Sequence, residues 1–306
     1  MKKFAPSLTL MMFALIALLM SCKKESVQSE NKNADSSFTF VYLTDIHLYP
    51  DKGAPEAFQQ VIDTVNKMDP DFVMTGGDLI MDALGQRYEN ADSLYRLYNT
   101  YASQFKMPVY NTIGNHEVFG LYEASGVDTT HNFYNEKLYE ARIGKKYYAF
   151  DHKGWRFMVL DAIGQTPGRK YIGYIDSMQV DWIKQELQQL NKSTPIALSV
   201  HIPFLTVLTE LQEGALVPNG KGIIINNAKE VLELFQDHNL KLVLQGHLHY
   251  LEDIYVTGIH FITAGAVSGS WWNGPRMGVE EGFLKVEVQG EDFDWEYIDY
   301  GWDAMQ

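Results

Sequence analysis

From residue 38 onward, short apolar runs alternate with longer segments in which apolar residues recur at helical spacing. The apolar runs predict β-strands at residues 38–44, 71–76, 108–113, 195–200 and 240–245. Several of these runs are apolar at nearly every position, as expected of strands that are covered on both faces. The amphipathic segments predict helices at residues 55–68, 90–105 and 178–190. This alternation predicts an α/β fold.

Two further segments interrupt the alternation with predicted hairpins. Residues 146–162 and 283–299 each contain two β-rich runs, separated by turn residues at 151–154 and at 289–291. Antiparallel strands of this kind imply mixed sheets, so we expect two packed mixed β-sheets flanked by helices. The sequence shows neither an internal repeat nor a second linker, and residues 38–306 are therefore predicted to form a single domain.

The first 22 residues resemble an export signal. Lys2 and Lys3 precede an apolar stretch from residue 8 to residue 20, which is short for a membrane span and typical of a signal-peptide core. The sequence Leu-Met-Ser-Cys at residues 19–22 resembles a bacterial lipobox, which predicts a signal peptide at residues 1–21 and a lipidated Cys22. The alternative is an ordinary signal cleaved nearby, or an unprocessed anchor, with Cys22 incidental. The lipobox interpretation predicts a protein exported and lipid-anchored to the cell envelope, on its periplasmic or cell-surface face.

Residues 22–37 are predicted to be a flexible tether between this anchor and the folded domain. Apart from Cys22, this segment contains no aromatic residue and only one branched aliphatic residue, Val27, so it cannot bury itself in a core. A flexible chain of this length has an r.m.s. span of roughly 20 Å, enough to hold a domain clear of a membrane surface.

Composition limits the partners and the chemistry of the folded part. The chain has 25 basic and 39 acidic side chains, a formal net charge of −14, and no run of Lys or Arg beyond residue 24. We therefore expect a small substrate and no polymeric nucleic acid. Apolar residues make up 46% of the chain, enough for a sizeable core. Because Cys22 is the single cysteine, neither an intramolecular disulfide nor a thiolate metal cluster can form.

Polar side chains follow each of the five predicted strands at its carboxyl end. They are Asp45, His47, Asp78, Asn115, His116, His201, His247 and His249. In open α/β sheets, ligands bind beyond the carboxyl ends of the strands, because the loops there converge on one crevice. We therefore expect these carboxylates, amide and imidazoles to share one site. A donor set of this kind, without thiolate, suits Mn, Fe, Zn or Co better than Ca or Mg.

In order along the chain, these residues form the motifs DxH, GD, GNHE, H and GHxH. This order resembles the calcineurin-like metallophosphoesterase superfamily from residue 40 to about residue 265. The segments around Asp45, Asp78 and His116 look more like the cyclic-nucleotide phosphodiesterase and general phosphoesterase branches than like purple acid phosphatases. The latter have a metal-bound tyrosine where this chain has Met81, and they lack a histidine at the position of His47. The resemblance implies a four-layer sandwich of two sheets between helices.

The resemblance also implies a role for each strand-end residue. One metal ion would be held by Asp45, His47 and His249. A second ion would be held by Asn115, His201 and His247. Asp78 would bridge the two ions, and His116 would lie next to the phosphate of the substrate without binding metal.

The function implied is two-metal hydrolysis of a phosphomonoester or phosphodiester. The nucleophile would be a hydroxide shared by two divalent or mixed-valence ions, with His116 assisting the leaving group. The alternative is a metal-binding interaction module on the same fold without turnover. Neither the substrate nor the oligomeric state follows from the sequence.

One loop carries further candidates for substrate binding. Residues 265–278 contain Trp271, Trp272 and Arg276 in a Gly-rich frame that we expect to be exposed and mobile. Two interpretations remain open: a packed lid, or a stacking and phosphate-binding surface. Arg87 and Tyr49 are weaker candidates of the same kind.

The remaining polar residues near these motifs are predicted to have structural roles. Glu117 is expected to orient a neighbour by a hydrogen bond. Arg142, Lys145 and Lys146 are expected to form a solvated helix end. The histidines outside the strand ends are predicted to be surface or hydrogen-bonded residues; they are His131, His152, His238 and His260.

Overall fold

The computed structural model describes residues 36–304. The predicted signal peptide, Cys22 and all but the last two residues of the predicted tether lie outside the described residues. Within residues 36–304, no helix is both long enough and apolar enough to cross a membrane.

The first sheet has five strands in the order β13-β12-β1-β2-β3. Their bounds are β1 Ser37–Leu43, β2 Phe72–Thr75, β3 Val109–Tyr110, β12 Gly282–Gln289 and β13 Asp292–Asp299. Strands β1, β2 and β3 are parallel, whereas β12 runs antiparallel to both β1 and β13. The β12–β13 pair is one of the two predicted hairpins, which is thereby confirmed.

The second sheet has six strands in the order β10-β11-β9-β8-β5-β4. Their bounds are β4 Tyr148–His152, β5 Trp155–Val159, β8 Pro195–Ser199, β9 Asn239–Gln245, β10 Glu252–Val256 and β11 Ile259–Thr263. The four central strands are parallel, and the edge strands β4 and β10 are antiparallel to their neighbours. The β4–β5 pair confirms the other predicted hairpin. A separate hairpin of β6 Ile163–Gln165 and β7 Tyr171–Gly173 was not predicted.

Side-chain alternation along the strands packs the two sheets against each other. In β1, Phe40 and Tyr42 face the other sheet, while Val41 and Leu43 face away from it. In β9, Leu244 belongs to the core between the sheets. This period of two assigns each strand one face to the inter-sheet core and one face to the helices.

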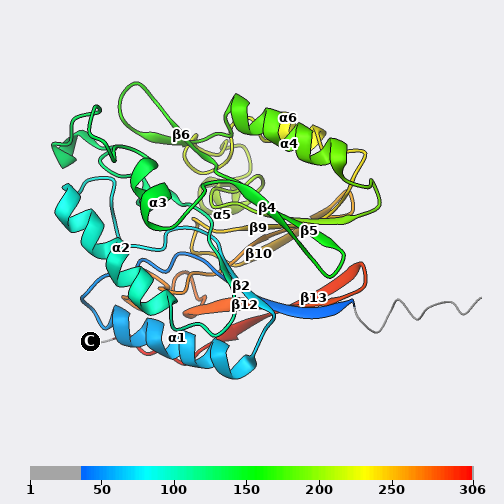
Figure 1. Ribbon diagram of the computed structural model, residues 1–306, viewed down its shortest axis with the longest axis horizontal. Helices are drawn as coiled ribbons and strands as arrows, with labels where there is room; N and C mark the ends of the chain where they lie inside the picture. The colour runs from blue at the N-terminus through cyan, green and yellow to red at the C-terminus, as the bar shows by residue number, and fades with distance from the viewer. Residues whose placement is uncertain (1–35, 305–306) are drawn as a thin grey trace, which may run out of the picture. The chain divides into compact units, whose positions relative to one another are not determined.

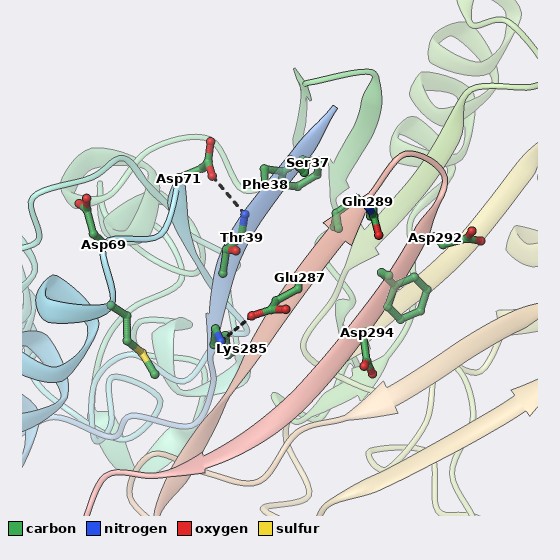
Figure 2. A pocket seen from close by; sticks show the side chains of 13 residues that line it. Ser37, Phe38, Thr39, Asp69, Asp71, Lys285, Glu287, Gln289, Asp292 and Asp294 are labelled. Carbon is green, nitrogen blue, oxygen red and sulfur yellow. Dashed lines mark hydrogen bonds and ion pairs between the residues drawn. The ribbon is translucent and has the colours of Figure 1, made fainter. Parts of the chain in front are cut away.

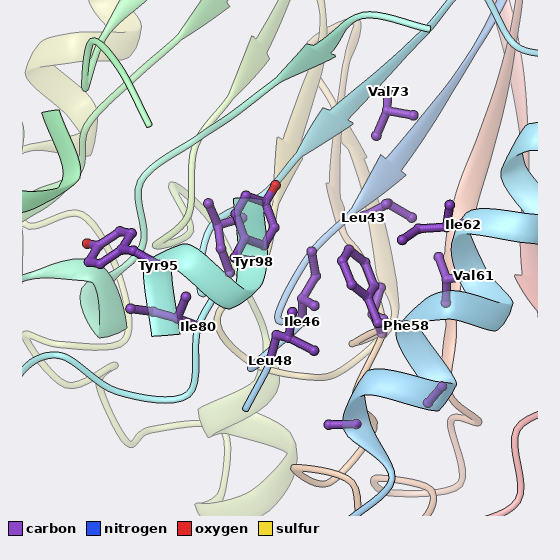
Figure 3. Packing of buried hydrophobic residues seen from close by; sticks show 14 of the residues in the cluster. Leu43, Ile46, Leu48, Phe58, Val61, Ile62, Val73, Ile80, Tyr95 and Tyr98 are labelled. Atoms are coloured by element: carbon purple, nitrogen blue, oxygen red, sulfur yellow. The ribbon is translucent and has the colours of Figure 1, made fainter. Parts of the chain in front are cut away.

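Helices cover the outer face of each sheet (Figure 1). Helices α1 Ala54–Met68, α2 Tyr88–Ala102 and α3 Lys137–Arg142 share a core with the first sheet. Figure 3 shows α1 directing Phe58, Val61 and Ile62 toward the strands. Helices α4 Ser177–Gln189 and α6 Ala228–Glu233 cover the second sheet, and α5 Leu208–Glu213 lies in the connection between β8 and β9. The four layers confirm the predicted fold.

The main difference from the prediction is the third strand. Residues 108–113 were expected to form a strand, but β3 is only Val109–Tyr110. After it, Asn111 leaves the ladder, and its side-chain oxygen accepts hydrogen bonds from Thr75 and Tyr98. The chain is thereby redirected early toward the loop that carries Asn115.

Candidate metal centre

The carboxyl ends of five strands from the two sheets meet at one place. Asp45 and His47 follow β1, Asp78 follows β2, His201 follows β8, and His247 follows β9. The short 3-10 helix η1, Asn115–Glu117, follows β3, and His249 lies in the loop after β9. The structure therefore brings together every strand-end residue that the sequence indicated.

One group of donors consists of Asp45, His47 and His249. The Nε2 atoms of His47 and His249 are 3.0 Å apart. Asp45 Oδ1 lies 3.3 Å from His249 Nε2 and 3.9 Å from His47 Nε2. All three side chains are buried, so these donors face each other out of contact with solvent.

A second group consists of Asp78, His201 and His247, with Asn115 beside it. His201 Nε2 lies 3.1 Å from Asp78 Oδ2 and 3.1 Å from Asn115 Oδ1. His247 Nδ1 is 3.3 Å from His201 Nε2. Asp78 Oδ2 is also 3.6 Å from His47 Nε2, so this carboxylate lies between the two groups.

His116 lies at the open side of the cluster. Its Nε2 is 3.8 Å from Asp78 Oδ2, and its side chain is 24% exposed, whereas those of His47 and His201 are fully buried. The Nδ1 atom is hydrogen-bonded to the carbonyl of Met81. A carbonyl only accepts, so Nδ1 carries a hydrogen and Nε2 is the nitrogen that faces the cluster.

Carbonyl groups also fix the ring orientation of three other histidines. His201 Nδ1 donates to Gly76 O at 2.7 Å, His249 Nδ1 donates to Gly269 O at 2.6 Å, and His247 Nε2 donates to Gly222 O at 2.9 Å. The remaining nitrogens of His201 and His249 therefore turn toward Asp78 and Asp45, and that of His247 turns toward His201. His47 Nδ1 is buried and has no partner within residues 36–304.

This arrangement fits bound cations. The Nε2 atoms of His47 and His249 lie 3.0 Å apart with Asp45 Oδ1 beside them, close enough for one cation to contact all three. Seven nitrogen and oxygen donors from Asp, Asn and His side chains, without thiolate, match the preferences of Mn, Fe, Zn and Co. The residues at this site therefore suit metal ions as the sequence predicted.

The charges within the cluster are strongly coupled. Burial opposes ionisation of Asp45, but the charge of His249, its hydrogen bond and the charge of His201 together outweigh burial and lower the pKa of Asp45 to about 2. Burial disfavours the cationic form of His201, yet Asp78 raises the pKa of His201 to about 9. Burial and the charge of His201 lower the pKa of His247 to about 4. The carboxylates thus stabilise positive charge at the cluster. Bound cations would supply that positive charge in place of a protonated histidine.

The backbone at the site is held in sparsely populated conformations. Five of the predicted ligands have φ between 46° and 72°; they are Asp45, His47, Asp78, His247 and His249. Non-glycine residues rarely adopt this left-handed region, and such strain concentrates at functional sites.

Hydrogen bonds between the first two loops hold this geometry in place. Asp45 N donates to Gly77 O at 3.0 Å, and His47 N donates to Asp78 O at 2.9 Å. Gly77 has φ 92°, and a Cβ there would lie 2.6 Å from His201 Nδ1. The close approach of the loops therefore requires glycine at this position.

The structure confirms the hydrogen-bonding role predicted for Glu117, and this side chain contacts more than one neighbour. Its carboxylate accepts the backbone N–H groups of Asp78, Leu79, Ile80 and Gly114 at 2.7–3.2 Å. Burial and the charge of Asp78 raise the pKa of Glu117 to about 7. One buried side chain thus joins the loop after β2 to the loop after β3.

The Trp271–Trp272 loop differs from its prediction. Trp272 is 1% exposed, and its Nε1 donates to His47 O at 3.0 Å, so the expectation of an exposed Trp272 is wrong. Trp271 is half-buried, with its ring centroid 4.3 Å from that of His249. The Arg276 guanidinium lies 5.1 Å from the Trp271 ring centroid. Trp271 and Arg276 therefore lie at the edge of the strand-end cluster, while Trp272 is buried and bonded to the backbone of His47.

Two of the predicted structural roles are also corrected. Arg142 was expected at a solvated helix end, but its side chain is only 28% exposed and pairs with the buried Asp92 at 2.6 Å. Lys146 was expected at a solvated helix end, but its side chain is only 17% exposed and pairs with Glu136 at 2.5 Å and Asp161 at 3.0 Å. Three of the remaining histidines are hydrogen-bonded as predicted: His131 to Phe133 N, His152 to Asp71 and His260 to Asp253.

Sequence reasoning missed Tyr171, whose ring lies edge-on to His247 with a centroid distance of 5.9 Å. Tyr171 begins β7, and nothing in the sequence around that strand connects it to the end of β9. Gly222, which accepts from His247, was missed for the same reason.

Figure 2 shows a cavity whose lining includes none of the cluster residues. It has a volume of about 870 Å³ and lies at the beginning of β1 and the β12–β13 turn. Asp71 there accepts from Thr39 N at 3.1 Å and Lys285 pairs with Glu287 at 2.6 Å, and none of the described residues that line the cavity is a histidine, whereas the strand-end cluster combines histidines with carboxylates. The strand-end cluster is therefore the better candidate for chemistry.

Three kinds of comparison with known proteins agree on the family or the fold. A family model described as calcineurin-like phosphoesterase matches residues 38–251. A probable cyclic nucleotide phosphodiesterase of Xenorhabdus bovienii is 22% identical over 255 residues, which cover 79% of this chain and 92% of that protein. A dimetal phosphatase of Danio rerio has a TM-score of 0.57 at 15% identity, covering 86% of this chain and 99% of that one. GAP50, the anchor in the inner membrane complex of Plasmodium, has a TM-score of 0.56 at 16% identity, covering 87% and 85%.

Proposed function

Because this chain belongs to the calcineurin-like phosphoesterase family and is a metal-dependent phosphoester hydrolase, we propose that its strand-end cluster is a two-metal centre for small phosphomonoesters or phosphodiesters. The observation that carries the proposal is the pair of donor groups that meet at Asp78. In-line displacement at phosphorus is commonly catalysed by two neighbouring metal ions.

The donor groups suggest which residues hold each ion. Asp45, His47 and His249 would hold one, because their donor atoms lie within 3.9 Å of each other. Asn115, His201 and His247 would hold the other. Asp78 would contact both, since its Oδ2 lies between His47 and His201.

When bound, the ions would supply Lewis acidity to the phosphoryl oxygens and lower the pKa of a water molecule. The chain's own contribution is to place acid–base groups beside them. Since His116 Nδ1 donates to the Met81 carbonyl, Nε2 is the nitrogen that faces the cluster, and in the doubly protonated ring it could donate a proton to the departing oxygen. Burial of the ligand side chains keeps competing water away from the donors.

Trp271 and Arg276 are proposed as substrate contacts at the edge of the cluster. The Trp271 ring lies beside His249, and Arg276 lies over that ring. A planar leaving group could stack on the indole, and the guanidinium could meet a phosphate oxygen. Trp272, in contrast, is committed to its hydrogen bond with His47 and is unavailable to substrate.

The alternative is a scaffold without turnover. The Plasmodium anchor shows that the fold is compatible with an anchoring role in that protein. In this chain, all seven proposed ligands and His116 are present and gathered, an arrangement that a purely structural role does not require. Catalysis is therefore the better-supported function.

The test combines metal analysis with substrate turnover. The purified protein, reloaded with Mn²⁺, should bind about two ions per chain and hydrolyse 4-nitrophenyl phosphate or bis(4-nitrophenyl) phosphate. A protein that binds two ions but hydrolyses neither these esters nor a wider panel of nucleotides and sugar phosphates would support the scaffold instead.

We further propose that the protein is exported and anchored through a lipid on Cys22. The support is the lipobox-like sequence at residues 19–22. In cells fed a labelled fatty acid, the wild-type protein should acquire the label and fractionate with membranes. A Cys22→Ser variant that does both as well as the wild type would contradict this proposal.

A further inference from the structure

The hydroxyl group of Thr44 is bonded to one oxygen of the proposed metal ligand Asp45. Thr44 lies between the end of β1 and Asp45, and it is fully buried. Its Oγ1 donates to Asp45 Oδ2 at 2.7 Å, because a carboxylate can only accept. A hydrogen bond to an ionised group is roughly twice as strong as one between neutral groups, so this contact can fix how the carboxylate is turned.

The two oxygens of Asp45 have different surroundings. Oδ2 accepts from Thr44 and also from His247 N, at 2.9 Å. The same N–H is farther from Oδ1, at 3.2 Å. Oδ1 instead lies 3.3 Å from His249 Nε2 and 3.9 Å from His47 Nε2. One oxygen is therefore held by donors of the protein, while the other lies beside the imidazoles of its donor group.

Two loops approach the Thr44 side chain so closely that only glycine fits beside it. A Cβ built on Gly76 would lie 2.6 Å from Thr44 Oγ1. A Cβ built on Gly246 would collide with the same oxygen and would lie 2.8 Å from Asp45 Oδ2. Gly76 follows β2 of the first sheet and Gly246 follows β9 of the second. Loops from both sheets thus enclose the hydroxyl and hold it against Asp45.

We propose that Thr44 is a positioning residue of the metal centre, whose hydroxyl retains Asp45 Oδ2 so that Asp45 binds its ion through Oδ1 alone. The proposal rests on the two-metal centre proposed above and adds a residue to it. Carboxylates can bind a metal through one oxygen or through both. Binding through one oxygen leaves a further coordination position for water or substrate, as catalytic metal sites require.

The effect of Thr44 should be greatest on the ion that Asp45 holds. His247 belongs to the other donor group, and its backbone N–H shares Asp45 Oδ2 with Thr44. Its imidazole, however, is oriented separately by the carbonyl of Gly222, at 2.9 Å. Loss of the Thr44 hydroxyl therefore releases the Asp45 carboxylate and leaves the ring of His247 in place.

The test measures Mn²⁺ binding to the metal-free protein by calorimetry. Thr44→Val replaces the hydroxyl with a methyl group, and Thr44→Ala removes it without placing a methyl group beside Asp45. Each should weaken one of the two Mn²⁺ sites by about 10–100-fold, the usual effect of removing a group that orients a metal ligand. Thr44→Ser keeps the hydroxyl and should retain the affinity of the wild type.

Thr263→Val is the matched control. Thr263 is also fully buried, and its hydroxyl donates to a carboxylate, that of Glu252, at 3.2 Å. Glu252 is not a proposed ligand. This variant loses a comparable hydrogen bond and should have a lower Tm, but both of its Mn²⁺ affinities should equal those of the wild type.

Two results would overturn the proposal. One is wild-type Mn²⁺ affinity in Thr44→Ala and Thr44→Val, which would leave the hydroxyl with a structural role alone. The other is an equal loss in Thr44→Ser, which would assign the effect to the methyl group of threonine. Because the readout is binding, it is separate from turnover: a protein that binds both ions and cleaves no ester would refute the proposed hydrolysis without deciding against Thr44.

Discussion

Replacing Glu117 with glutamine should destabilise the protein, because this carboxylate joins two loops of the metal centre. Its oxygens accept four backbone N–H groups, from Asp78, Leu79, Ile80 and Gly114. The amide of glutamine keeps one acceptor oxygen, so two of these buried N–H groups lose their partner. A hydrogen bond to a charged group is worth about 1.5–3 kcal/mol, which gives a loss of about 3–6 kcal/mol in the free energy of unfolding.

Thermal unfolding followed by circular dichroism measures this loss. For a domain of this size, about 3–6 kcal/mol corresponds to a fall in Tm of at least about 6 °C. The measurement belongs at pH 8, where a carboxyl with a pKa of about 7 is ionised. Glu213→Gln, at an exposed position, is the matched control and should leave Tm unchanged. If Glu117→Gln has the same Tm as this control, the four hydrogen bonds do not stabilise the loops.

Other consequences of the site can be tested separately. Asp78→Asn should lower the content of both metal ions, measured by elemental analysis, whereas a change confined to one ion would contradict the bridging position. His116→Ala should reduce kcat by about 10²–10⁴-fold with metal content intact, and loss of metal would make it a ligand. Trp271→Leu should raise KM without changing Tm, while Trp272→Leu should lower the free energy of unfolding by about 3 kcal/mol in denaturant titrations; the reverse pattern would exchange their roles. Chelation should lower Tm but leave the far-ultraviolet circular dichroism spectrum unchanged, and a lost helix signal would show that the fold depends on metal.

The strand-end residues could be predicted because their placement is local. Asp45 and His47 follow β1 within four residues, so recognising the strand also places these two proposed ligands. Packing of the two sheets then brings the ends of β1 and β9 together, and this packing follows from apolar positions that are visible in the sequence.

Burial of the remaining residues depends on contacts between distant parts of the chain. The Gly-rich composition around Trp272 suggested exposure, but its partner is the carbonyl of His47, 225 residues away. Lys146 looked like a solvated charge because neither Glu136 nor Asp161 is adjacent to it in sequence, although both pair with it in the fold. Composition predicts the average environment of a segment, whereas a single long-range hydrogen bond decides the environment of one side chain.

The bracing of the ligand loops bears on how this protein acquires its metals. The hydrogen bonds from Asp45 N to Gly77 O and from His47 N to Asp78 O involve no metal, and neither do the carbonyl contacts of the histidine rings. Proteins whose metal sites form only on folding must take up metal while they fold and lose structure when it leaves. Because these bonds join protein groups to one another, we expect the loops to keep their positions when the ions leave, so that other ions could replace them in the folded protein. The metals that occupy the site should then depend on which ions are available where the protein works. The same protein should be active with different pairs of ions as that availability changes.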